Sequence, residues 1–206
     1  RVLELDLAVH KTIVEIEEEF DVAILLGALT SEEACRRDMK LSHLINVEST
    51  IMLIEQLLSK GTFVIFPSTS MVFSGEELKP SPRSKKSPLG VYAEQKHEVE
   101  ERILQFNEAN LMILRLSKVI TRDQPLFENW VSQITENKIV RAFGDKVFSP
   151  VSNLEVCKLF NRAILKCPRG VYHFSGRTDL SYFEAAALIA KTLGLDESLI
   201  EKVSVF

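Results

Sequence analysis

The sequence has no hydrophobic run long enough to cross a membrane, no excess of basic residues and only three cysteines. A membrane-spanning helix needs about 20 consecutive apolar residues, and no segment approaches that length. The formal net charge of -4 argues against a surface for nucleic acid or anionic membranes. Cys35, Cys157 and Cys167 lack the spacing of metal ligands and fit a reducing cytoplasm. These absences predict a cytoplasmic protein that has no metal site and binds neither nucleic acid nor membrane.

The first part of the chain alternates between short apolar runs and helical patterns. Strands are expected at 2–7, 22–26, 63–66 and 111–116, with helices at 12–20, 41–59 and 91–106. The segment before the last of these helices contains Pro80, Pro82 and Pro88, which exclude a regular element there. Such alternation predicts an α/β fold with a doubly wound parallel sheet.

The second part of the chain is less regular. Helices are expected at 127–136 and 154–165, and strands at 139–143, 170–174 and the C-terminal 203–206. Ser181 and Glu184 have the spacing of a capping box, which predicts a helix that begins there and stops at Gly194. We therefore expect a smaller α/β portion after the main sheet.

Ligands of an open parallel sheet bind at the carboxyl ends of its strands. Four features are expected at this edge: Asp6, Gly27 with Ala28, Ser68 with Thr69, and Leu116 with Ser117. A carboxylate there can accept hydrogen bonds from a ribose or an adenine amine, and small residues let a flat cofactor approach the backbone. For Asp6 the alternative is the N-cap of a helix.

Tyr92 and Lys96 are four residues apart and therefore share one face of a helix. An ammonium one turn away favours the phenolate and is expected to lower the pKa of Tyr92 toward the range useful for proton transfer. The same ammonium could hold a ribose hydroxyl, and the Thr69 hydroxyl could bind a substrate carbonyl oxygen. The alternative is that Tyr92 is a core aromatic residue and Lys96 a solvated surface charge.

Two longer segments make the pattern more specific. Residues 68–73 read Ser-Thr-Ser-Met-Val-Phe, and residues 87–96 read Ser-Pro-Leu-Gly-Val-Tyr-Ala-Glu-Gln-Lys. In order and spacing they resemble the extended short-chain dehydrogenase/reductases, specifically the dTDP-4-dehydrorhamnose reductase-like branch, which has Ser-Thr-Asp-Tyr-Val-Phe and Ser-Pro-Leu-x-Val-Tyr-Gly-x-x-Lys. Weaker similarities include Asn46 and the segment 170–176.

The resemblance implies an oxidoreductase of polysaccharide biosynthesis with a Rossmann-type fold. It implies a cofactor, NADP or NAD, and a nucleotide-linked keto-sugar as substrate. The catalytic residues implied are Thr69, Tyr92 and Lys96. The cofactor-binding residues implied are Asp6, Leu7, Leu26, Gly27, Ala28, Ser68, Tyr92, Lys96 and Leu116. The substrate-binding residues implied are Thr30, Thr69, Ser70 and Lys118.

The sequence departs from the family in lacking a Gly-x-x-Gly-x-x-Gly turn, which would hold a pyrophosphate. We therefore expect 1–125 to be a dinucleotide-binding domain without its first strands, and 126–206 to be mainly substrate-binding, with interleaved segments. In the strand order of this fold two strands separate 2–7 from 22–26, so these two are not expected to pair. About 30 or more residues are then expected upstream, and one or two further elements downstream.

Two alternative functions remain open. An epimerase or dehydratase of the same fold would share Thr69, Tyr92 and Lys96, although Ser70-Met71 does not supply the acidic pair expected of a dehydratase. A non-catalytic regulatory or binding subunit would fit the missing glycine-rich turn. The helices at 41–59 and 91–106 could form the face of a homodimer, or could pack on the chain's own sheet.

Overall fold

The computed structural model describes residues 2–14, 16–77, 79–106 and 110–205, which form two compact units. Unit 1 comprises Arg1–Leu116 and Phe160–Phe174, and unit 2 comprises Ser117–Leu159 and Ser175–Phe206. The chain thus passes from unit 1 to unit 2, returns to unit 1 at Phe160 and enters unit 2 again at Ser175.

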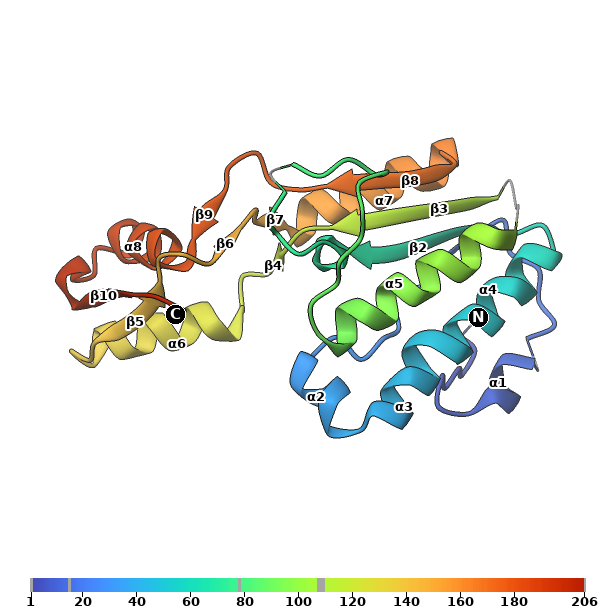
Figure 1. Ribbon diagram of the computed structural model, residues 1–206, viewed down its shortest axis with the longest axis horizontal. Coiled ribbons are helices and arrows are strands. Elements are labelled where there is room, and N and C mark those ends of the chain that lie inside the picture. Colours follow the sequence, from blue (N-terminus) through green and yellow to red (C-terminus); the bar gives the residue numbers. More distant parts are fainter. Residues whose placement is uncertain (1, 15, 78, 107–109, 206) are drawn as a thin grey trace. The chain divides into compact units, whose positions relative to one another are not determined.

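Unit 1 is built on a four-stranded parallel sheet (Figure 1). Its strands, in spatial order, are β1 (Val22–Ile24), β2 (Phe63–Thr69), β3 (Leu111–Leu116) and β8 (Gly170–Phe174). The two central strands, β2 and β3, are almost entirely buried, which explains their continuous apolar sequences. The predicted α/β fold with a parallel sheet is confirmed.

In the sequence, the helices of unit 1 alternate with these strands. They are α1 (His10–Val14), α2 (Glu32–Arg37), α3 (Met39–His43), the π-helical turn η1 (Leu44–Ser49), α4 (Thr50–Ser59), α5 (Val91–Ile103) and the second half of α7 (Asn153–Lys166). Two short 3₁₀ turns belong to the same unit, η2 (Ser70–Val72) and η3 (Leu104–Phe106). In Figure 1, α4 and α5 lie side by side against the sheet. Their buried side chains, among them Ile54 and Val99, pack with Val64 and Phe66 of β2 in one core.

Unit 2 contains three two-stranded pairings and two longer helices. The pairings join β4 (Val119–Ile120) to β7 (Val151–Ser152), β5 (Val140–Phe143) to β10 (Ile200–Val203), and β6 (Val147–Phe148) to β9 (Leu180–Ser181). The helices are α6 (Pro125–Thr135) and α8 (Tyr182–Leu193), with a 3₁₀ turn η4 (Glu197–Leu199). A core around Trp130 joins α6, α8 and β5. The predicted capping box at Ser181 and the left-handed Gly194 are both present.

Three expected elements near the N-terminus differ from the structure. Residues 2–7 form no strand, because no neighbouring strand in the described chain pairs with their backbone, and Val2 is 96% exposed. As predicted, residues 2–7 do not pair with β1. The helix expected at 12–20 is replaced by the short α1, and β1 ends at Ile24 rather than at residue 26. The C-terminal strand β10 lies at Ile200–Val203, earlier than predicted, and Phe206 lies outside the described residues.

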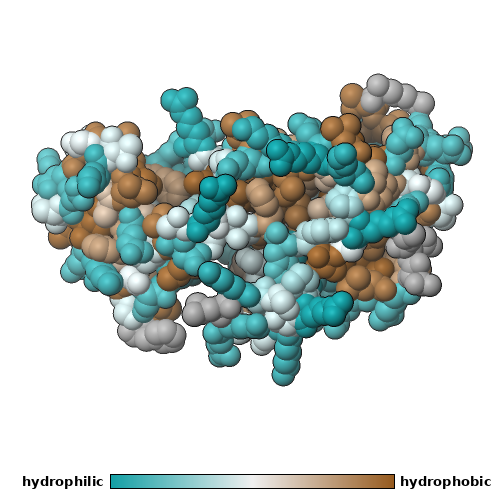
Figure 2. All heavy atoms as spheres, turned by 90° about the horizontal axis from the view of Figure 1, so that it is seen from above, coloured by the Kyte–Doolittle hydropathy of each residue, from teal (hydrophilic) through white to brown (hydrophobic). Residues whose placement is uncertain are grey.

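The surface is mixed in character. Figure 2 shows hydrophilic side chains that project outward, with hydrophobic residues visible between them. Of the helices in the described chain, none has the length and apolar character needed to span a bilayer. Among the same residues, no group of three or more His, Cys, Asp or Glu side chains is placed to hold a metal ion.

Candidate active site

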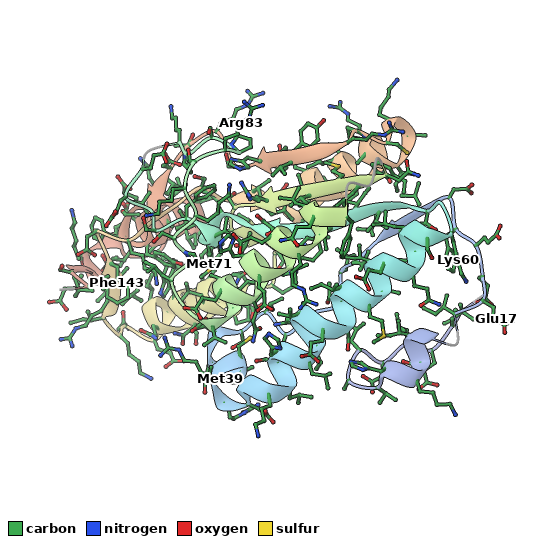
Figure 3. The ribbon with its side chains drawn as sticks, turned by 45° about the vertical axis from the view of Figure 1, so that its right-hand side comes forward. Glu17, Met39, Lys60, Met71, Arg83 and Phe143 are labelled. Atoms are coloured by element: carbon green, nitrogen blue, oxygen red, sulfur yellow. The ribbon has the colours of Figure 1, made fainter. Side chains whose placement is uncertain are left out.

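The hydroxyl groups of Ser68 and Thr69 lie at the carboxyl end of β2, on opposite faces of the strand. The Ser68 hydroxyl donates a hydrogen bond to Oε1 of Glu100 at 2.5 Å. Thr69 Oγ1 accepts a hydrogen bond from the backbone N–H of Met71 at 3.1 Å, which begins η2. Met71 follows as an exposed side chain (Figure 3). Within the described chain the Thr69 O–H therefore has no acceptor and can donate, whereas the Ser68 O–H already donates to Glu100.

Lys96 is buried against the same strand. Its side chain comes from the second turn of α5, is 5% exposed, and donates from Nζ to the carbonyl oxygen of Pro67 at 3.0 Å. The ammonium also lies 4.4 Å from the ring centroid of Phe66 and 6.0 Å from that of Tyr92. Lys96 is therefore not a solvated surface charge, and the alternative that treated it as one is wrong.

The pKa values of Tyr92 and Lys96 move in opposite directions. Burial lowers the pKa of Lys96 to about 8, and the carboxylate of Glu100 partly opposes that shift. Burial raises the pKa of Tyr92 to about 12, with a smaller contribution from Cys35. The sequence had predicted a lowered pKa for Tyr92. That expectation is wrong for the protein without ligands, because the phenol is desolvated and the Lys96 ammonium is directed at the Pro67 carbonyl.

Glu32, on α2, holds the first turn of α5 in place. Its carboxylate accepts hydrogen bonds from the backbone N–H groups of Val91 at 3.0 Å and Tyr92 at 3.1 Å, and Arg36 donates to it at 2.7 Å. A Cβ added to Gly90 would lie 2.8 Å from this carboxylate, and the backbone φ of Gly90 is +103°. Only glycine fits there. Sequence reasoning missed Glu32 because no local spacing connects it with α5.

Asn46, in the π-helical turn η1, fixes the loop that follows β1. Its Oδ1 accepts from the N–H of Leu29 at 2.8 Å, and its Nδ2 donates to the Leu29 carbonyl at 2.9 Å. Nδ2 also donates to Oε1 of Gln95 on α5 at 2.8 Å. Asn46 therefore connects the loop of Gly27 and Ala28 to the helix that carries Tyr92. The sequence had singled out Asn46 by resemblance alone.

The residues expected to bind a cofactor lie after β1, at the ends of β2 and β3, on α5 and in the segment before α1. Asp6 is exposed, and its Oδ1 accepts from the N–H of Ala8 at 2.8 Å, so its carboxylate supports a turn and is not the N-cap of α1. A Cβ on Gly27 would lie 3.2 Å from Leu7, so these two residues are neighbours. Leu26 is 67% exposed. Ala28 is half-buried, and Leu116 ends β3.

The residues expected to bind substrate are divided between the units. Thr30 and Ser70 are exposed in unit 1. Lys118 belongs to unit 2, where its Nζ lies 5.6 Å from the ring centroid of Tyr182. Unit 1 thus brings together Ser68, Thr69 and Lys96, whereas Lys118 lies near Tyr182 in unit 2.

We expect replacement of Lys96 by methionine to stabilise the fold. The folded-state pKa of about 8 lies below the ordinary 10.5, so the unfolded chain binds more protons between these pH values. Deprotonation of Lys96 therefore raises the free energy of unfolding as the pH increases from about 8 to 10.5. Below pH 8 the protein bears the full cost of burying the Lys96 charge. Lys96→Met should therefore raise the free energy of unfolding at pH 7 by on the order of 2 kcal/mol.

Urea unfolding of the full-length protein at pH 7 and pH 10 measures this effect. Lys158, exposed on α7, provides a matched control, because Lys158→Met removes a solvated charge and should change stability by less than about 0.5 kcal/mol. A Lys96→Met protein that is less stable than the wild type at pH 7 would contradict the prediction.

Comparison with known proteins places this arrangement in a family. Residues 3–205 match the family described as RmlD substrate binding domain. The chain belongs to this family. The predicted resemblance to the extended short-chain dehydrogenase/reductases is thereby confirmed. Among solved structures, dTDP-4-dehydrorhamnose reductase from Bacillus anthracis str. Ames in complex with NADP is similar, with a TM-score of 0.88. It is 20% identical, and the match covers 98% of this chain and 72% of that chain, so the two share a fold.

Curated relatives of this RmlD family member are 25% identical to it. They include spore coat polysaccharide biosynthesis protein SpsK of Bacillus subtilis (strain 168), with a match that covers 87% of this chain and 64% of the relative. The match to methionine adenosyltransferase 2 subunit beta of Xenopus laevis covers 80% of this chain and 52% of the relative. The chain therefore spans less than two thirds of these two relatives.

Proposed function

We propose that the protein is an NAD(P)-dependent reductase that acts on the ketone of a nucleotide-linked sugar, as in the dTDP-4-dehydrorhamnose reductases. The observation that carries this proposal is the position of Lys96, which is buried beside the end of β2 and lies on the same face of α5 as Tyr92. Burying an ammonium is costly, so a site that keeps one uses its charge. Similarity to the NADP complex of a dTDP-4-dehydrorhamnose reductase supports the assignment.

The residues of unit 1 fit the nicotinamide and ribose part of NADP or NAD. The Lys96 ammonium has three N–H donors, and one described hydrogen bond, to Pro67, uses one of them. The others suit ribose hydroxyls. Gly27 and the exposed Leu26 offer a flat ring an apolar surface close to the backbone. We assign the same cofactor role to Asp6, Leu7, Ala28, Ser68, Tyr92 and Leu116. When bound, the nicotinamide supplies the hydride.

The proton would come from Tyr92. Because its pKa is about 12, the phenol is fully protonated at neutral pH and can donate to a substrate oxygen that becomes negative. Thr69 would donate its free O–H to the same oxygen and orient the carbonyl. Below about pH 8 Lys96 is mainly charged, so its ammonium would stabilise the phenolate that Tyr92 leaves.

Unit 1 is the part of the chain to which we assign ligand binding. Unit 1, with its parallel sheet, suits the dinucleotide. We assign a substrate-binding role to Thr30, Thr69 and Ser70 of unit 1, and the role expected of Lys118 stays a prediction. We also propose that the enzyme is cytoplasmic, which agrees with its three free cysteines, and that it forms a homodimer through α4 and α5.

Cofactor binding and turnover test the proposal. Titration of the full-length protein with NADPH or NADH is expected to quench the fluorescence of the protein. Addition of dTDP-4-dehydrorhamnose should then lead to consumption of the reduced cofactor. The loss of absorbance of the reduced nicotinamide measures turnover. A protein that binds neither cofactor is not a reductase of this kind.

A second function is favoured by one comparison. The similarity to methionine adenosyltransferase 2 subunit beta suggests a non-catalytic subunit of another enzyme. Ser70 and Met71, which replace the Asp-Tyr of the reductases, agree with that function. Cofactor binding without turnover of any nucleotide keto-sugar would favour it, whereas turnover without net consumption of cofactor would indicate an epimerase or dehydratase.

A further inference from the structure

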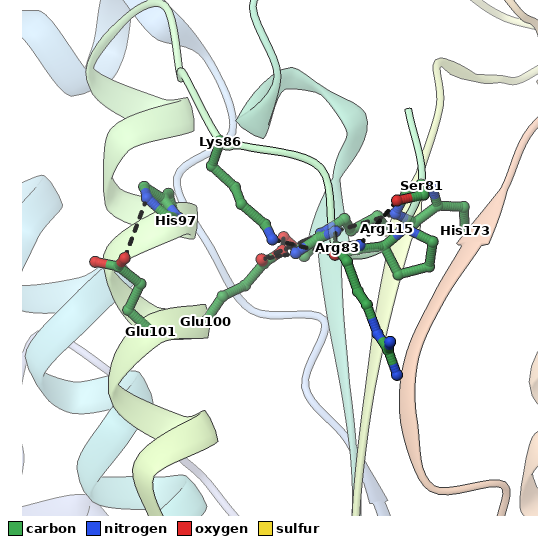
Figure 4. A network of polar contacts seen from close by, with 10 residues as sticks. Ser81, Arg83, Lys86, His97, Glu100, Glu101, Arg115 and His173 are labelled. Carbon is green, nitrogen blue, oxygen red and sulfur yellow. Dashed lines mark hydrogen bonds and ion pairs between the residues drawn. The ribbon is translucent and has the colours of Figure 1, made fainter. Parts of the chain in front are cut away.

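Glu100 and Arg115 form a buried ion pair between α5 and β3 (Figure 4). Glu100, one turn after Lys96 on α5, is 1% exposed, and Arg115 of β3 is 2% exposed. Arg115 donates from Nε to both carboxylate oxygens of Glu100, at 3.0 and 3.1 Å, and from Nη2 to Oε2 at 2.6 Å. This geometry leaves both charges compensated, although neither reaches water.

The pair connects four elements and a loop. Ser68 of β2 donates to the Oε1 atom of Glu100. On the other side, Nη1 of Arg115 lies 3.0 Å from Nε2 of His173 on β8 and donates to the Pro82 carbonyl at 3.1 Å. Burial and the Arg115 charge lower the pKa of His173, which keeps the imidazole neutral and able to accept this hydrogen bond. Glu100 and Arg115 therefore fix the end of β2 and the loop that leads to α5.

Ser68 connects the Glu100–Arg115 ion pair to the candidate active site. Its neighbour Pro67 offers the carbonyl that binds Lys96, and its other neighbour is Thr69. The Glu100–Ser68 hydrogen bond thus holds the peptide segment 67–69 against α5. A shift of that segment would move the Thr69 hydroxyl and the Lys96 anchor together.

We propose that Glu100 is a positioning residue of the reductase site, which sets the place of Thr69 through Ser68 and places a carboxylate one helical turn from Lys96. This inference rests on the function proposed above. A buried ion pair contributes little net stability compared with a well-packed apolar pair, so stability alone does not account for it. A carboxylate near a buried ammonium has a direct effect on the protonation that catalysis uses.

Several charged groups surround this carboxylate and decide the sign of the effect. Lys96 is on its own helix, Arg115 faces it from β3, and His173 lies beyond Arg115. Lys86, from the loop before α5, reaches toward the pair and donates to the Pro82 carbonyl at 3.1 Å. Glu100 raises the pKa of Lys96 against the larger effect of burial. Removing the carboxylate leaves Arg115 as an uncompensated cation nearby, which disfavours the Lys96 ammonium further.

The protonation of Lys96 can be measured without turnover. In full-length protein with ¹³Cε-labelled lysine, assigned with Lys96→Arg, the wild-type Lys96 signal is expected to titrate near pH 8. In Glu100→Gln the midpoint should fall by about one pH unit or more. An unchanged midpoint in a folded Glu100→Gln protein overturns the proposal. If that variant does not fold, the Ser68→Ala comparison below, which leaves the ion pair intact, decides the proposal.

Ser68→Ala tests the positioning role separately. It leaves the ion pair intact and should reduce kcat about tenfold with little change in KM, because the carbonyl-orienting segment loses its tether. Ser49→Ala is the matched control, since Ser49 is fully buried and its hydroxyl has no partner within the described chain. Equal kcat values for wild type, Ser68→Ala and Ser49→Ala would overturn the positioning role. A wild type without turnover would refute the proposed function, and the Lys96 titration would still decide the effect of Glu100.

Discussion

Tyr92→Phe is expected to reduce kcat by about 10²–10⁴-fold, because it removes the proton donor and leaves the ring in place. The phenol is half-buried in the first turn of α5, and Glu32 fixes the backbone N–H of this residue. Its pKa of about 12 keeps the proton on the phenol until the substrate oxygen becomes negative. Loss of one neutral hydrogen bond should weaken NADPH binding by less than about tenfold.

Single-turnover kinetics and NADPH titration of the same preparation separate these two effects. Tyr172→Phe is a suitable control, because Tyr172 lies on β8, is 41% exposed and donates its hydroxyl to the carbonyl of Arg169. That variant should keep kcat within about twofold of the wild type. A Tyr92→Phe enzyme with wild-type kcat would refute the assigned role of Tyr92.

Arg115→Met is expected to lower the free energy of unfolding by about 3–5 kcal/mol, because the buried carboxylate of Glu100 loses its counter-ion. The cost arises from the remaining charge and not from lost packing. Replacing Glu100 by methionine as well should therefore restore most of the stability, although the donors and acceptors of Ser68 and His173 then lack these partners.

Urea unfolding of the two single variants and the double variant forms a double-mutant cycle that measures this coupling. The exposed pair of Arg141 and Glu201 provides the control. Arg141→Met should cost at most about 1 kcal/mol, because solvent screens a surface pair. A double variant that is as unstable as Arg115→Met alone would show that packing, and not the unpaired charge, causes the loss.

Local patterns in the sequence were sufficient for most of the fold. Continuous apolar runs predicted β2 and β3, and the spacing of Ser181 and Glu184 predicted the start of α8. These signals are local because an apolar run and a capping box are both made of residues close together in the chain. The strand expected at 2–7 failed for the complementary reason, since a strand also requires a partner, which its own residues cannot supply.

The same division holds for the candidate site. The sequence by itself determined that Thr69, Tyr92 and Lys96 stand in an order and spacing typical of reductases, which is a covalent property of the chain. Only the tertiary structure decided that Lys96 is buried and that the pKa of Tyr92 rises. It also revealed Glu32 and Glu100, whose contacts join residues up to 60 positions apart. Burial and electrostatics depend on distances in space, and those are fixed only when helices and strands pack.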